Sequence, residues 1–161
     1  AAAGAQAVYI ADSWASCDII SPSLFARFAL PYQRNTALAA QEAGLHPILW
    51  NLGDIVPILD LEAALPLAGF AFEQPRKGWS VTVADVRRAF GPRRCLFGNL
   101  DSEALLLRND PAEIHVAVSD QLAQSGPGAP FILSTGSPLP SDIDPASVDA
   151  IMSSLHHLSR G

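Results

Sequence analysis

Apolar and polar residues follow one another along the chain in blocks that predict strands and helices in turn. Five apolar runs have the length of a strand and end in polar residues; they cover residues 6–11, 46–50, 68–73, 94–99 and 130–134. Continuous apolar runs of this length are typical of strands buried on both faces of a parallel sheet. We therefore expect five strands whose polar ends meet at the carboxyl edge, where α/β folds hold their sites.

Helix signals lie between these runs. Three of them pair an N-cap residue with proline at the first helical position: Ser21-Pro22, Asp110-Pro111 and Asp144-Pro145. Apolar residues at helical spacing predict helices over residues 22–44, 55–65, 83–90, 110–123 and 144–158. Pro31 should kink the first of these or split it. Strict alternation without hairpin signals predicts an α/β fold of parallel β/α units with right-handed crossovers.

The length of 161 residues suits a single domain, which we take as residues 1–161. A net charge of −6 without a run of Lys or Arg disfavours nucleic acid and anionic membranes as partners, and no apolar stretch is long enough to span a bilayer. Cys17 and Cys95 match no zinc spacing, so we expect reduced thiols in a cytoplasmic protein.

Five β/α units fit either an open sheet or part of an eight-stranded barrel, and the length of the chain alone does not separate the two. No strand is followed by a Gly-x-Gly-x-x-Gly motif or a phosphate-binding loop. The nucleotide-binding form of the open sheet therefore has no support in the sequence.

Two carboxylates close predicted strands. Asp12 and Glu73 would lie at the mouth of a barrel, where they could bind a proton, a metal or a cationic ligand. The alternative is that they form ion pairs or cap the next helix; the available cations are Arg76, Lys77 and Arg94.

The run at residues 94–99 leads into Gly98-Asn99-Leu100-Asp101. Asn99 either contacts substrate or braces the rim, and Asp101 either contacts substrate or caps a helix through Leu105. Trp50 lies at a strand end and, with Trp14 and Trp79, could form an aromatic wall or simply pack.

Three segments resemble one known superfamily in the same order along the chain. The helix start at residues 20–32, the Gly-Asn-Leu-Asp segment at 98–101 and the helix start at 144–148 resemble those of the uroporphyrinogen decarboxylases and corrinoid methyltransferases. The resemblance implies a TIM-type barrel, of which this chain would be the C-terminal portion with about five strands. It also implies that the main catalytic groups lie upstream of Ala1.

The resemblance carries over to a few site residues. The zinc ligands of the methyltransferases would align with Trp50, Leu52 and Ser137; because Trp and Leu cannot ligate zinc, we expect no metal. Ser137 also stands where the decarboxylases have a loop histidine, and it can donate a hydrogen bond to a carboxylate. Ser13 roughly matches a decarboxylase serine that contacts a substrate carboxylate. Together with the residues at strand ends, these matches give a candidate substrate-binding set of Asp12, Ser13, Trp50, Glu73, Asn99 and Ser137.

The function implied for the full-length form is decarboxylation of uroporphyrinogen, a tetrapyrrole, without a cofactor. Two alternatives stay open: a zinc-independent methyltransferase that uses a corrinoid, and a non-catalytic relative that binds a tetrapyrrole or corrinoid. Part of a barrel also exposes sheet edges and an apolar interior. We therefore expect the chain to form a homodimer or to need an N-terminal half.

Overall fold

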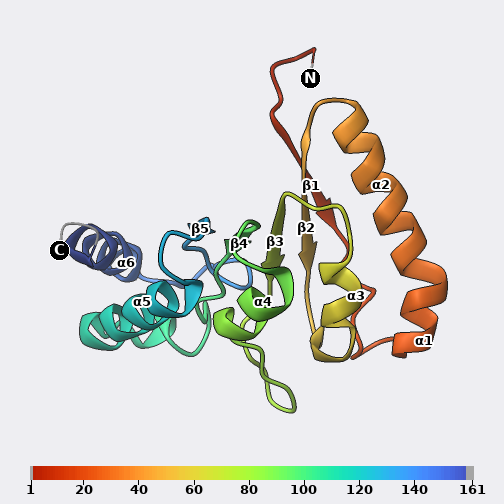
Figure 1. Cartoon of the computed structure of the whole chain (residues 1–161). Coiled ribbons are helices and arrows are strands. Elements are labelled where there is room, and N and C mark those ends of the chain that lie inside the picture. Colours follow the sequence, from red (N-terminus) through yellow and green to blue (C-terminus); the bar gives the residue numbers. More distant parts are fainter. Residues whose placement is uncertain (1, 159–161) are drawn as a thin grey trace.

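One parallel sheet organises the part of the chain that the computed structural model describes, residues 2–158. Its five strands lie side by side in the order in which they occur along the chain (Figure 1). They are β1 (Ala7–Ala11), β2 (His46–Asn51), β3 (Gly69–Phe72), β4 (Cys95–Phe97) and β5 (Phe131–Ile132). The predicted α/β fold with five parallel strands is confirmed, although β4 and β5 are shorter than the apolar runs that contain them.

Helical segments connect each strand to the next. They are α1 (Pro22–Leu24), the π-helical η1 (Phe25–Ala29), α2 (Leu30–Glu42), the 3-10 turn η2 (Val56–Ile58), α3 (Leu59–Ala63), α4 (Val83–Phe90), the 3-10 turn η3 (Leu106–Arg108) and α5 (Pro111–Ser125), followed by α6 (Pro145–Leu158) after the last strand. Among residues 2–158, none of the helices combines the length and apolar character that a bilayer crossing needs.

Pro31 interrupts the first helix as predicted. The Ser21 hydroxyl accepts a hydrogen bond from the Leu24 amide at 3.3 Å and so caps α1. The π-helical η1 then ends directly before α2, in whose first turn Pro31 lies. Proline has no amide hydrogen and its ring excludes the carbonyl four residues earlier, so a wider π turn accommodates it.

The segment at 55–65 is less helical than its pattern indicates. The structure has the 3-10 turn η2 and then the five-residue α3 in place of one continuous helix. Pro57 lies in η2 and Pro66 follows the segment, so each end contains a residue that cannot donate a backbone hydrogen bond.

The helices pack against one face of the sheet, which makes the main core. Leu49, Phe70 and Leu96 share this face and are fully buried against apolar residues of the helices that cover it. A second, smaller cluster lies between η3, α5 and α6, at the end of the sheet opposite α2 (Figure 1). The two clusters fix the helices on one side of the sheet.

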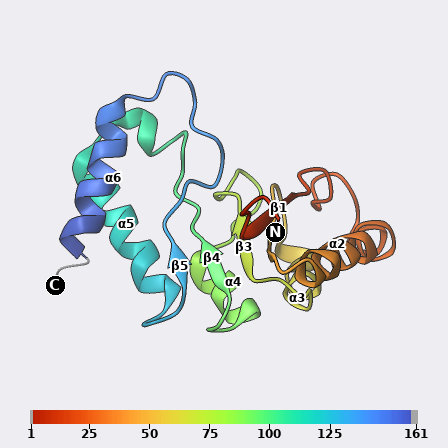
Figure 2. The ribbon, with the colours of Figure 1, turned by 90° about the horizontal axis from the view of Figure 1, so that it is seen from above.

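The other face of the sheet is open. In the register of the sheet, Trp50, Ala71 and Phe97 lie side by side on it. The side chains of Tyr9 and Ile132 are 50% and 47% exposed there. A shallow hollow of about 410 Å³ runs across this face. Seen from above, the strands form an arc with the helices around its outside, so the open face is the concave one (Figure 2).

Candidate functional site

Polar residues gather at the carboxyl edge of the sheet, as the sequence predicts. Asp12 follows β1, Gly53 comes two residues after β2, Glu73 follows β3, Asn99 comes two residues after β4, and Ser137 lies in the segment after β5. Because all five strands are parallel, these residues arrive at one edge of the sheet.

Glu73 is the centre of the contacts at this edge. Its Oε1 accepts hydrogen bonds from Nε of Arg76 at 2.6 Å and from Oγ of Ser137 at 3.2 Å, and its Oε2 accepts one from the Gly53 amide at 2.7 Å. Gly53 has φ +86°, a conformation that glycine adopts without strain and that presents its amide to the carboxylate. Both oxygens of the Glu73 carboxyl, a residue only 9% exposed, therefore accept hydrogen bonds.

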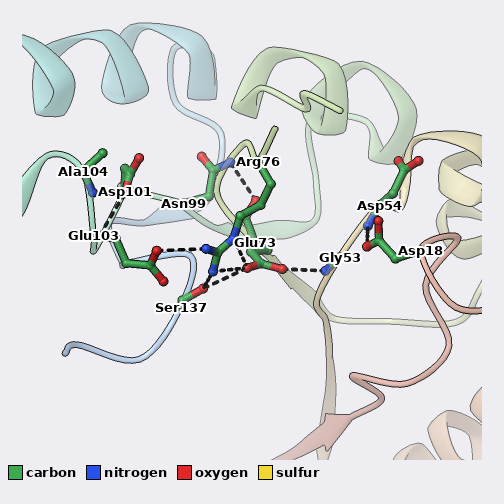
Figure 3. A network of polar contacts seen from close by, with 10 residues as sticks. All are labelled: Asp18, Gly53, Asp54, Glu73, Arg76, Asn99, Asp101, Glu103, Ala104 and Ser137. Atoms are coloured by element: carbon green, nitrogen blue, oxygen red, sulfur yellow. Dashed lines mark hydrogen bonds and ion pairs between the residues drawn. The ribbon is translucent and has the colours of Figure 1, made fainter. Parts of the chain in front are cut away.

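Arg76 extends these contacts toward solvent. Its Nη2 lies 2.6 Å from Glu73 Oε1 and 3.4 Å from Ser137 Oγ, and its Nη1 lies 3.0 Å from Glu103 Oε2 (Figure 3). Two backbone hydrogen bonds with Trp79 hold Arg76 in a tight hairpin. Desolvation lowers the pKa of Arg76, but the hydrogen bonds and charges of Glu73 and Glu103 outweigh it and raise that pKa above its usual value, so the cation is permanent.

We call the set of Gly53, Glu73, Arg76, Glu103 and Ser137 the rim network. Of the two alternatives for Glu73, the structure shows the ion pair, with Arg76 as the cation. The network also joins two of the predicted site residues, Glu73 and Ser137, directly. Glu103 was not predicted, because it lies in a turn after Asp101 and no strand pattern points to it.

Asn99 braces the rim. Its Nδ2 donates to the main-chain carbonyls of Glu73 at 3.1 Å and Val81 at 3.3 Å, and its Oδ1 accepts from Nε2 of Gln121 at 3.0 Å. A Cβ at the preceding Gly98 would collide with the Gln121 side chain and the Phe131 ring, so glycine is required for this close approach. The amide of Asn99 therefore links β3, the start of α4 and α5.

Asp101 has the capping role that was one of its two alternatives, but the helix through Leu105 does not form. Its Oδ1 accepts from the amides of Glu103 at 2.9 Å and Ala104 at 2.7 Å, which closes a turn (Figure 3). Between this turn and α5 the only helical element is the 3-10 turn η3, which begins at Leu106. The capping bonds are those of a helix start, but the following residues do not continue it.

Asp12 and Ser13 lie at the other end of the carboxyl edge. The Asp12 carboxylate accepts a hydrogen bond of 2.8 Å from Nε2 of Gln33 on α2, so it is joined to the helix layer. Ser13 is the next residue and is partly exposed in the loop after β1. Gln33 was missed, although its spacing with Ala37 and Ala40 on α2 placed it on the buried stripe.

Glu62 is a second buried acid that sequence reasoning missed. It is 0% exposed, and its Oε1 accepts a 2.6 Å hydrogen bond from Nδ2 of Asn51. Burial raises the pKa of this carboxyl to about 8; the Asn51 hydrogen bond opposes the shift, and the Asp12 charge adds to it. The burial of Glu62 could have been predicted from its spacing, since Ile58, Glu62 and Leu65 lie on one helical face.

Trp50 belongs to an aromatic wall on the open face. Its ring centroid lies 5.8 Å from that of Tyr9, which in turn lies 6.5 Å from Phe97. Trp14 is not part of this wall, because it is 80% exposed in a loop, and Trp79 packs against the main core. Tyr9 and Phe97 could have been found from the two-residue alternation of their strands.

The carboxyl edge and the open face bring a cation and aromatic rings to the same side of the protein. The rim network offers a guanidinium and a hydroxyl, which both donate to carboxylates, and the open face offers aromatic rings. Within residues 2–158, no group of three or more His, Cys, Asp or Glu side chains is placed to hold a metal ion.

The fold and the carboxyl-edge site define the class: a parallel β/α segment of the TIM-barrel type. The family model for uroporphyrinogen decarboxylase (URO-D) matches residues 1–158. The chain therefore belongs to the uroporphyrinogen decarboxylase family.

Named relatives agree with this assignment. The chain is 35% identical over 164 residues to uroporphyrinogen decarboxylase of Ovis aries and 32% identical over 161 residues to that of Azotobacter vinelandii. The matches cover 99% and 98% of this chain and 42% of each relative. The chain thus spans less than half the length of the curated relatives that it matches.

A solved structure shares the fold. A methyltransferase from Methanosarcina mazei superposes with a TM-score of 0.82 at 23% sequence identity, over 98% of this chain and 44% of that protein. The likeness confirms that the five β/α units form part of a barrel.

Proposed function

We propose that the complete protein is a uroporphyrinogen decarboxylase-like lyase that acts in porphyrin biosynthesis. The observation that carries the proposal is the match of the family model to residues 1–158, together with relatives named for this activity. Because the chain spans 42% of those relatives, the activity is assigned to the complete protein rather than to residues 1–161 alone.

The site geometry is suited to such a substrate. Uroporphyrinogen carries several carboxylates around a ring of pyrroles, and the rim network holds the half-exposed guanidinium of Arg76, which can donate to a carboxylate. The wall of Tyr9, Trp50 and Phe97 offers apolar contact for a pyrrole. These residues would bind and orient the substrate while a pyrrole is protonated, and a fixed orientation lowers the barrier of that step.

The state of the cysteines agrees with a cytoplasmic location, which is part of the proposal. Cys17 and Cys95 are free thiols. Burial raises the pKa of each thiol, and the charges of Asp54, Glu62 and Asp18 add to the shift at Cys17. Such thiols are poor nucleophiles and are expected to stay reduced in the cytoplasm.

The direct test is an assay of the complete protein with uroporphyrinogen under reducing conditions. The products are oxidised and separated by chromatography, and the expected result is conversion to coproporphyrinogen. Glu113 lies on α5 and forms an exposed ion pair with Arg108. The variant Glu113→Gln is a control that should keep the activity of the wild type.

Other outcomes decide between the alternatives. Tetrapyrrole binding without any turnover would contradict the decarboxylase and support a non-catalytic relative. Corrinoid binding that chelators leave unchanged, in the absence of decarboxylation, would instead support a zinc-independent methyltransferase.

A further inference from the structure

Arg76 has two carboxylate partners that differ in how firmly they are held. Nε and Nη2 contact Glu73, whose side chain is 11% exposed, and Nη1 contacts Glu103, whose side chain is 50% exposed. The Arg76 side chain itself is 38% exposed. One side of the guanidinium therefore faces the protein, and the other meets a carboxylate that water can reach.

The inner partner fixes the guanidinium in place. Glu73 is tied by the Gly53 amide and the Ser137 hydroxyl as well as by Arg76, and the hairpin between Arg76 and Trp79 holds the arginine backbone. A guanidinium oriented in this way loses little freedom when it binds another carboxylate, because its conformation is already set.

The outer partner is easily exchanged. An ion pair between exposed side chains is weak, since water screens the charges and two long side chains lose freedom. Glu103 lies in the turn closed by Asp101, on the side of Arg76 away from Gly53 (Figure 3), and its side chain is half-exposed. A ligand that also makes apolar contacts elsewhere on the protein can therefore displace the Glu103 carboxylate from Arg76.

The charge balance points the same way. Glu73 and Glu103 bring two negative charges to the single positive charge of Arg76. An anionic ligand added to this set meets net repulsion. If the ligand carboxylate replaces Glu103, the number of negative charges around the guanidinium stays the same.

We propose that Arg76 is a carboxylate-binding residue whose outer face Glu103 occupies in the free protein and which a carboxylate of the ligand takes over on binding. The inference deepens the proposed function and rests on its carboxylate-rich tetrapyrrole substrate. Glu103 then acts as a competitor, and its removal improves binding.

The test measures binding of uroporphyrin, the stable oxidised form with the same carboxylates, to the complete protein by fluorescence. Glu103→Gln, which keeps the shape of the side chain and removes its charge, should lower Kd by roughly 3- to 10-fold. Arg76→Gln should raise Kd by about 10-fold or more. Glu113→Gln, which removes a matched exposed ion pair between Arg108 of η3 and Glu113 of α5, should leave Kd unchanged.

The decisive comparison is the double variant Arg76→Gln/Glu103→Gln. If Glu103 competes for Arg76, the gain from Glu103→Gln disappears once Arg76 is absent. An equal gain in both backgrounds would show only long-range repulsion and would overturn the inference, as would no gain at all. If Arg76→Gln does not fold, Glu103→Gln alone still tests the inference, because a Kd equal to that of the wild type would overturn it.

Turnover separates this inference from the proposed function. In one outcome the wild type fails to decarboxylate uroporphyrinogen while the Kd values of the single and double variants follow the expected pattern. That result would contradict the proposed function and still support the Arg76 site. Turnover by the wild type with no effect of Glu103 on Kd would contradict the Arg76 site alone. Failure of the wild-type protein to bind uroporphyrin would overturn the inference.

Discussion

Glu62 carries a proton at neutral pH, because burial raises the pKa of its carboxyl to about 8. In the unfolded chain the same group ionises at its ordinary pKa near 4.5. Between these values the folded protein binds a proton that the unfolded chain has released. The contribution of Glu62 to stability is therefore complete below about pH 4.5 and declines as the pH rises to about 8.

The change Glu62→Gln should remove this pH dependence. The amide cannot ionise, so the variant should gain stability over the wild type as the pH rises, by an amount on the order of a few kcal/mol at pH 8 to 9. Thermal unfolding of the complete protein between pH 5 and pH 9 measures it. Glu42→Gln, at an exposed position of α2, is the control.

The result expected is a difference in Tm that widens with pH for Glu62→Gln and stays flat for Glu42→Gln. A constant difference across the range would mean that Glu62 is already ionised in the folded state. The assignment of a neutral acid at this position would then be wrong.

Individual residues also show what the sequence alone could and could not predict at the site. The ends of apolar runs located Glu73, Asn99 and Ser137 correctly at one edge, because strand ends are visible in a pattern. Their partners were not visible, since Glu73 and Ser137 are 64 residues apart and meet only through the order of the strands. The same limit hid the hydrogen bond between Asp12 and Gln33, 21 residues away.

At the scale of elements, Asn99 joins three of them through its side-chain amide. Asn99→Ala would leave the carbonyls of Glu73 and Val81 and the amide of Gln121 without their partner in a buried place. An unpaired buried polar group costs roughly 1 to 3 kcal/mol, so we expect a loss of about 2 to 4 kcal/mol. Chemical denaturation of the complete protein measures the loss.

A comparison with an exposed asparagine makes this prediction specific. Asn35→Ala on the solvent side of α2 should change stability by less than about 0.5 kcal/mol. If Asn99→Ala instead kept the stability of the wild type and weakened only uroporphyrin binding, Asn99 would be a substrate-contacting residue, and the bracing role would be rejected.

Helices and strands were predicted best where a local signal fixes them. Ser21 and Asp110 accept the predicted capping hydrogen bonds, because an N-cap and proline at the helix start act within one turn. The segment at 55–65 and the turn after Asp101 were predicted less well. There an apolar stripe or a capping residue indicated a helix, but neither determines how far it continues.

At the scale of the whole molecule, the sheet has one covered face and one open face. Tyr9, on the edge strand β1, is 50% exposed and lies on the open face with Trp50 and Phe97. The outer edge of β1 pairs with no other strand among residues 2–158. Unpaired edges and large apolar faces promote association. Residues 1–161, produced alone, should therefore form dimers or larger species.

The substitution Tyr9→Glu tests whether this face is the one that associates. A charge on the open face should shift residues 1–161 toward the monomer and reduce binding of an apolar dye, since burying an unpaired charge is costly. Val116→Glu is the matched control, because Val116 is 58% exposed on α5, far along the helix layer. Sedimentation and light scattering report the change. An open concave face of this composition needs a second copy or the remainder of a barrel to cover it. If residues 1–161 of the wild type are monomeric, melt cooperatively and bind no dye, the interpretation as part of a barrel is contradicted.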